Sequence, residues 1–328
     1  MYNSKLLKMT FFCVMISCLL FSCKQKLTKD EGEKQLRAFD NEMIIMSKQL
    51  TESHAYRLLL QLNTIKHLPL PFQFGSAASG KPYNYNFEAS KGLYRYDKVK
   101  NEMVKSAPSD SIILIFPYQS EVDSVAKVVV TTYEEEQSVW NIMLPIKLEA
   151  KILLANHTVL NIHCRGEIKY GLPVDYEFEM EFSRFQVKTA LTTKLSRKRG
   201  RVNIALSVLK DNSEIFNCES NLITRMNEYQ QIDYSSIKSK IEVFPLTIDI
   251  NIDRDKIDKH TTHFIDDFNR NSSILVYGNN SRTLIGKIEL KDRPNNDKLN
   301  PAIVYTDGSV EYLNDLLFTV EQILNVKY

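Results

Sequence analysis

Residues 146–182, IKLEAKILLANHTVLNIHCRGEIKYGLPVDYEFEMEF, contain the pattern that decides the fold. Apolar residues take every second position, and charged or polar residues lie between them. Strict alternation of this kind is typical of strands with one buried face and one solvated face. Asn156 and Gly171 mark breaks of turn length. The stretch therefore predicts three consecutive antiparallel strands.

The same pattern continues on both sides of this stretch. Strands are predicted from about residue 93 to residue 226, with shorter ones at 274–277, 283–290 and 302–305. The apolar positions change phase at Ser183 and Arg184, which predicts a tight turn or a bulge there. Consecutive short strands separated by turns indicate an antiparallel meander.

Helical periodicity appears before and after the strands. Apolar residues recur at three- and four-residue spacing over residues 33–50, and again after Ser53 until Pro69. Residues 253–269 and 314–325 show the same spacing. We predict an α+β fold in which the N-terminal helix pair and the C-terminal helix pack on one face of a large curved antiparallel β-meander sheet. Residues 34–328 are predicted to form this domain, with a possible sub-boundary at 229–239.

The first 23 residues have the layout of a secretion signal that ends at a cysteine. Lys5 and Lys8 precede a nearly unbroken apolar run, and Ser22 stands directly before Cys23. An ordinary signal peptide with an incidental cysteine and a buried core helix are the alternatives, but a core helix should show a polar face, and this run has none. We expect residues 1–22 to be removed and Cys23 to be lipidated, with residues 23–33 as a polar tether.

The residues after Cys23 resemble bacterial sorting signals. An aspartate in the next position would favour inner-membrane retention, whereas this chain has Lys24, so the resemblance implies an outer-membrane location. Lys29, Asp30 and Glu31 resemble the surface-export signal of Bacteroidota lipoproteins, although they lie further from the cysteine than usual. Surface display and a periplasm-facing position both stay open.

Charge limits the classes of partner. The full chain carries a formal charge of +2, and removal of Lys5 and Lys8 with the signal leaves a neutral mature chain. A neutral chain gives no reason to expect nucleic acid or an anionic surface as a partner. We expect contact with the membrane through the acyl chains on Cys23, and we leave open whether the partner is a protein, a glycan or a lipid.

Two cysteines are expected to stay in the folded domain. Cys164 and Cys218 could form a disulfide in an oxidising envelope compartment. Both also occupy apolar positions of predicted strands, where a free cysteine behaves as a small hydrophobic residue. We favour two free cysteines, with the disulfide as the alternative.

Candidate catalytic and metal-binding residues are few. His260 and His263 lie three residues apart on a predicted helix, but zinc needs three or four converging ligands. Alternate positions of one predicted strand carry carboxylates that could serve glycoside hydrolysis, or could simply pair with cations across strands on a solvated face; these residues are Asp175, Glu177, Glu179 and Glu181. The sequence has neither a glycine-rich phosphate loop nor a Gly-x-Ser-x-Gly motif. We therefore predict no cofactor and no enzymatic activity.

Several stretches resemble uncharacterised outer-membrane lipoproteins of Bacteroidota. In those proteins a Gly-x-Tyr strand precedes an apolar strand ending in Phe-Pro, as in residues 91–94 (KGLY) and 109–117 (SDSIILIFP). The charged meander from Lys147 onward, and residues 305–309 (YTDGS) before a terminal amphipathic segment, are similar too. The resemblance covers most of the mature chain. It implies no activity and no functional residue, because none is assigned to that family.

Two functions are compatible with these features. The first is a non-enzymatic, membrane-tethered envelope protein that binds or scaffolds a partner. The second is a carrier or chaperone for an apolar ligand or lipid held between sheet and helices. An apolar cavity of several hundred Å³ under the sheet would favour the carrier.

Overall fold

The described chain is built from long strands and a few helices. The computed structural model describes residues 27–71, 85–118, 124–138, 143–196, 199–226, 232–258, 263–278, 283–293 and 296–319. It divides into two compact units, one made of Met43–Glu242 with Ile252–Asp255 and the other of Met1–Glu42, Val243–Asn251 and Lys256–Tyr328. We call them the meander unit and the terminal unit.

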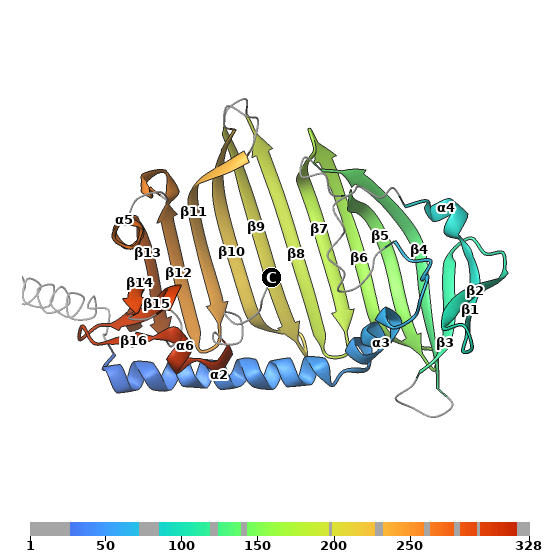
Figure 1. Cartoon of the computed structure of the whole chain (residues 1–328), viewed down its shortest axis with the longest axis horizontal. Coiled ribbons are helices and arrows are strands. Elements are labelled where there is room, and N and C mark those ends of the chain that lie inside the picture. Colours follow the sequence, from blue (N-terminus) through green and yellow to red (C-terminus); the bar gives the residue numbers. More distant parts are fainter. Residues whose placement is uncertain are drawn as a thin grey trace, which may run out of the picture. The chain divides into compact units, whose positions relative to one another are not determined.

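The meander unit is dominated by antiparallel strands that follow one another in chain order (Figure 1). Its sheet begins in the order β2-β1-β3 and then runs from β4 to β11. The strands are β1 (Gly92–Asp97), β2 (Glu102–Ala107), β3 (Ile112–Pro117), β4 (Val125–Gln137), β5 (Met143–Leu154), β6 (His157–Lys169), β7 (Leu172–Phe182), β8 (Phe185–Leu195), β9 (Arg199–Lys210), β10 (Ser213–Met226) and β11 (Ile232–Val243). The described helices are α3 (His54–Asn63) and α4 (Phe87–Ser90).

Two-residue turns connect the central hairpins. Ala155 and Asn156 both have positive φ, and so do Asp211 and Asn212. Positive φ at both central residues defines the turn whose twist matches that of paired strands. The predicted break at Ser183 and Arg184 is also confirmed as a turn between β7 and β8.

Helix α3 covers the first part of the meander. Ser53 caps its N-terminus, because the Ser53 side chain accepts a hydrogen bond from the amide of Tyr56. Leu58 and Leu62 are fully buried among apolar residues of β3–β6. One core cluster therefore joins this helix to the sheet.

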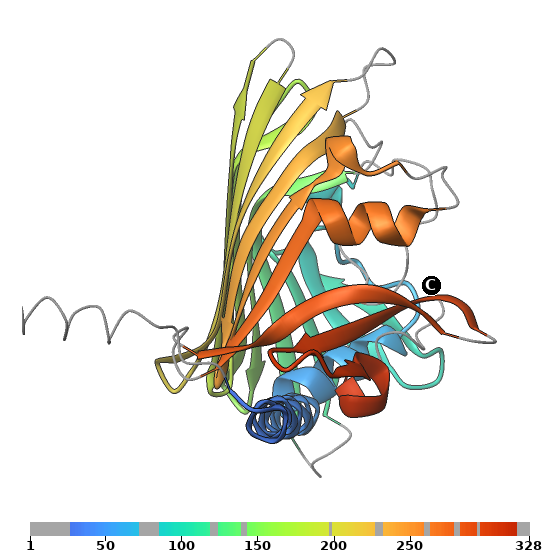
Figure 2. The ribbon, with the colours of Figure 1, turned by 90° about the vertical axis from the view of Figure 1, so that its left-hand side faces the viewer.

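The terminal unit has its own core around the beginning of helix α2 (Lys29–Thr51). Leu36 is buried together with apolar residues of the C-terminal strands. The remaining elements of this part of the chain are β12 (Leu246–Asp253), η1 (Arg254–Lys256), α5 (Phe264–Asn271), β13 (Ser272–Gly278), β14 (Thr283–Arg293), β15 (Asn296–Tyr305), β16 (Val310–Tyr312) and α6 (Leu313–Leu316). Figure 2 shows α5 beside these strands, where the Asn269 side chain exchanges hydrogen bonds with the backbone of Leu290.

The predicted fold class, α+β with an antiparallel meander and helices against one face, is confirmed. One pair departs from the antiparallel pattern, because β1 is parallel to β3. The helices in the described residues are not long and apolar enough to cross a membrane.

Three predicted segments are wrong in detail. The helix predicted at 253–269 is confirmed only from Phe264, where α5 begins; Asp253 ends β12, Arg254–Lys256 form η1, and residues 259–262 lie outside the described residues. The terminal helix is interrupted at Leu317, which has extended backbone angles, and residues 320–328 lie outside the described residues. The polar tether does not reach residue 33, because α2 begins at Lys29.

Candidate functional site

The inward side of the meander carries rows of side chains that cross several strands. In the register of the strands, Leu148 is opposite Cys164, and Cys164 is opposite Phe178. The row continues through Thr189 on β8 to Leu206 on β9 and Cys218 on β10. Because directly opposed residues share one face of a sheet, these six side chains lie on the same side as the core under α3.

Two parallel rows flank this one. The first runs Ala150, Ile162, Met180, Val187, Val208, Phe216. The second runs Gly166, Tyr176, Leu191, Ile204, Ser220. The inward face is therefore predominantly apolar from β5 to β10.

Burial changes sharply along these rows. Leu148 and Cys164 are 5% and 1% exposed, and Ala150 and Ile162 are similarly buried. From β7 onward every member of the three rows is only partly buried. We call this part the open apolar face, and it consists of Tyr176, Phe178, Met180, Val187, Thr189, Leu191, Ile204, Leu206, Val208, Phe216, Cys218 and Ser220.

Helix α3 explains the buried half. The space between this helix and the sheet, lined by Leu62, Leu70, Val128 and Leu160 among others, has a volume of about 10 Å³. That is room for about one water molecule. The helix therefore fills the inward face at β4–β6, and no carrier cavity exists at this place.

The open apolar face has the size of a binding surface. Four adjacent strands are about 19 Å wide, and three rows extend roughly 17 Å along them, which gives an outline of about 300 Å². Apolar patches of a few hundred Å² on soluble proteins commonly mark interaction sites. Polar groups are sparse here, and Ser220 is occupied by donating a 2.8 Å hydrogen bond to Ser239.

Tyr176 forms the boundary between the buried and the open part. A Cβ at Gly166 would lie 2.4 Å from the Tyr176 ring, so glycine is needed for the ring to lie over β6. The Tyr176 hydroxyl is 3.0 Å from Cys164 Sγ. Burial raises the pKa of the Cys164 thiol, although the hydrogen bond with Tyr176 opposes this effect. This is the opposite of the shift that activates a cysteine nucleophile, whose pKa is lowered.

The two cysteines are free, as the sequence favoured. Cys164 lies on β6 and Cys218 on β10, with three strands between them. That separation is about 19 Å at the usual strand spacing. A disulfide needs Cα atoms within about 7 Å, so this pair cannot form one within the chain.

Neither a protein-family model, nor a curated protein, nor a solved structure matches the chain.

The remaining predicted site residues are not brought together. Cys23 and His260 lie outside the described residues, and His263 stands at the start of α5. The part of the chain that the structure describes holds no group of three His, Cys, Asp or Glu side chains placed to bind a metal ion.

The carboxylates of β7 lie on the outward, solvated face. Glu177 pairs with Arg165 at 2.8 Å and Glu179 with Lys188 at 3.4 Å, both across neighbouring strands. The Arg165 guanidinium lowers the pKa of Glu177. The interpretation as cross-strand pairs on a solvated face is thus confirmed for Glu177 and Glu179.

A polar hollow lies on the same outward side. It has a volume of about 510 Å³, and its lining includes Glu149, Lys151, His163 and Glu179. His163 is directly opposite Glu149 on one side and Glu179 on the other. Glu179 also accepts a 2.6 Å hydrogen bond from Gln186. The hollow is open to solvent, and its lining carries charges of both signs.

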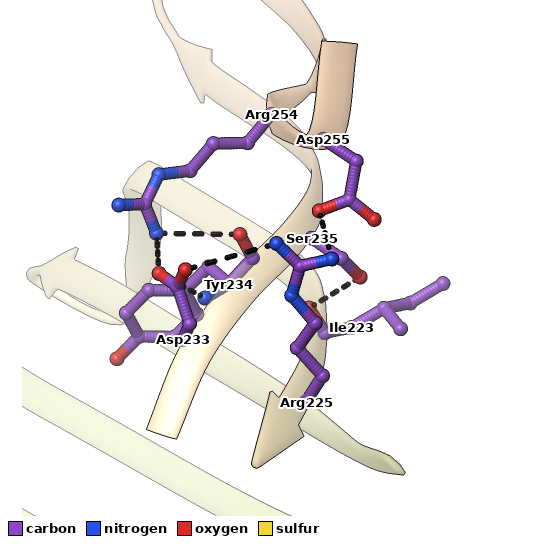
Figure 3. Close-up of polar contacts among 7 residues, drawn as sticks. All are labelled: Ile223, Arg225, Asp233, Tyr234, Ser235, Arg254 and Asp255. Carbon is purple, nitrogen blue, oxygen red and sulfur yellow. Dashed lines mark hydrogen bonds and ion pairs between the residues drawn. The ribbon is translucent and has the colours of Figure 1, made fainter. Parts of the chain in front are cut away.

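A charge network in the meander unit joins β10, β11 and the first two residues of η1, Arg254 and Asp255 (Figure 3). Arg225 on β10 contacts Asp255 at 3.1 Å and Asp233 at 4.0 Å. Arg254 contacts the same Asp233 and donates a 3.3 Å hydrogen bond to the carbonyl of Tyr234. Two cations and two carboxylates are thus paired with one another at a partly exposed position. We interpret the network as a structural connection between the strand ends, worth at most about 1 kcal/mol per pair.

Proposed function

We propose that this chain is a lipid-anchored, non-enzymatic envelope protein that binds an apolar or amphipathic ligand on the open apolar face. The change in burial along the rows supports the binding role. The same row is fully buried at Cys164 and partly exposed at Leu206, although both positions point inward. An apolar sheet face of this extent is stabilised by anything that removes it from water, at about 25 cal/mol per Å².

A ligand with an acyl chain fits this surface best. The face is broad and consists mainly of aliphatic, aromatic and sulfur-containing side chains, and polar groups such as Thr189 are few. Sites for small apolar ligands are lined in this way, with a few polar groups that orient the ligand. A lipid anchor at Cys23 would place the protein where such molecules are abundant.

The direct experiment for the ligand is a titration with a fluorescent fatty acid. The full mature chain should bind an anthroyloxy-labelled stearate saturably, and the label should report an apolar environment. A titration that shows no saturable binding would contradict the proposed ligand class. If a second copy of the chain covers the open apolar face instead, the protein will be a dimer in solution.

The anchor is tested by replacing Cys23. Cys23→Ala should abolish incorporation of radiolabelled palmitate and release the protein from the membrane fraction, because the proposed anchor is the acyl chains on that cysteine. Cys18→Ala, which changes a cysteine inside the predicted signal, is the matched control and should keep full labelling. Palmitate incorporation that persists in Cys23→Ala would show that the anchor assignment is wrong.

A further inference from the structure

The folded part of the terminal unit begins almost directly after the predicted anchor. The amide of Leu27 donates a 3.2 Å hydrogen bond to the carbonyl of Leu284 at the start of β14. The carbonyl of Leu27 accepts a 2.8 Å hydrogen bond from the hydroxyl of Thr306. Both backbone polar groups of Leu27, the amide and the carbonyl, are therefore hydrogen-bonded to the terminal unit.

The next residues keep this attachment rigid. Gly32 is packed so closely that a Cβ there would lie 2.8 Å from Ile285 and 3.3 Å from Tyr305. Further along α2, the buried Asp40 carboxylate accepts 2.9 Å hydrogen bonds from the amides of Phe318 and Thr319. The start of α2 therefore cannot unfold to lengthen the connection to Cys23 without disrupting the core of the unit.

Only residues 24–26 separate Cys23 from Leu27. The four Cα–Cα steps from Cys23 to Leu27 span at most about 14 Å when fully extended. We propose that this short connection holds one end of the terminal unit against the bilayer surface. That end consists of Leu27, the start of α2, the start of β14 and the turn Thr306–Ser309.

The inference rests on the proposed function, because it requires acyl chains on Cys23. It does not require this end to attract lipid. Its exposed residues include Thr28, Asp30, Glu31 and Asp307, and the neighbouring Lys29 is paired with Glu311 at 3.6 Å. The described residues of this end have no positive excess that would bind anionic lipid, whereas the connection itself carries Lys24 and Lys26. In vesicles of zwitterionic lipid, the covalent connection therefore sets the distance.

A fluorophore at the start of α2 measures the distance from the bilayer. Asp30→Cys offers an exposed attachment point, in a Cys218→Ser background that leaves Cys164 buried. The lipidated full chain is placed in phosphatidylethanolamine vesicles that carry a nitroxide on part of the headgroups. We expect strong quenching of the fluorophore by the headgroup nitroxide.

The matched variant carries about twelve glycine and serine residues inserted between Lys24 and Gln25, which allow a mean separation of roughly 22 Å from Cys23. Quenching should fall about twofold or more in this variant. Quenching that does not fall after the insertion, whether strong or weak in both proteins, would overturn the inference. Palmitate incorporation is measured on both proteins. Absent incorporation would overturn the proposed anchor and this inference with it, whereas labelled proteins with unchanged quenching overturn the inference alone.

Discussion

Leu206→Lys is expected to lower the affinity for the fluorescent fatty acid at least about tenfold, which corresponds to about 1.4 kcal/mol. Leu206 lies on β9 in the middle row of the open apolar face, between Thr189 on β8 and Cys218 on β10. A lysine there would have to be desolvated under a bound acyl chain without an opposite charge. The measurement is a fluorescence titration on the purified mature chain.

The matched control is Ala205→Lys, one residue earlier on the same strand. Ala205 is exposed on the outward face and stands directly opposite Glu219, which can pair with the new lysine. This variant should bind the probe as the unchanged protein does, and thermal unfolding should show that both variants are folded. Equal loss of affinity in the two folded variants would mean that the ligand does not lie on the inward face.

Leu58→Ala is expected to lower the free energy of unfolding by about 2–5 kcal/mol. Leu58 is 0% exposed and lies on α3 in the core that this helix forms with β3–β6. The surrounding space is already filled to within about 10 Å³, so removal of the leucine side chain leaves a new cavity. Chemical denaturation followed by circular dichroism gives the change.

Leu60→Ala on the same helix separates burial from helix propensity. Leu60 is 49% exposed, so its truncation should change the free energy of unfolding by no more than about 0.5 kcal/mol. A similar loss in the two variants would show that α3 does not pack on the sheet through Leu58.

The strands of the meander could be predicted because their pattern is local. Residues 146–182 show their register directly, since most of the apolar residues face the core and the charged residues between them face water. The turn at Ser183 was visible as a change of phase. Residues 232–243, which form β11, were instead assigned in part to a domain boundary. Their strand is mostly serine, lysine and isoleucine without a strict alternation.

The helix errors have a different cause. Residues 253–269 have helical spacing of apolar residues, yet Asp253 ends a strand and Arg254 is drawn into the contact with Asp233. The start of α2 was assigned to a polar tether because its sequence is charged. Its fold depends on the packing of Gly32 and Leu36 against strands more than 200 residues later in the chain, which no local pattern reveals.

The candidate site could be predicted only in part. The alternation of apolar and polar residues predicts that Leu206 and Cys218 point inward, because each occupies an apolar position of its strand. The alternation does not show that α3 covers β4–β6 and leaves the rows partly exposed from β7 onward. Which strands a helix covers depends on tertiary packing, which a local pattern does not contain. The cavity of several hundred Å³ that would favour a carrier is not found between α3 and the sheet, where the space measures about 10 Å³.

The most direct test of the proposed binding role is to identify what the protein carries in its own envelope. The chain is purified from that envelope without exchange of lipids, and molecules that are not covalently attached are extracted and identified by mass spectrometry. We predict a molecule with an acyl chain at about one per protein, retained in Ala205→Lys and lost in Leu206→Lys. An extract without such a molecule, or one in which Leu206→Lys retains as much as the unchanged chain, would contradict the proposal.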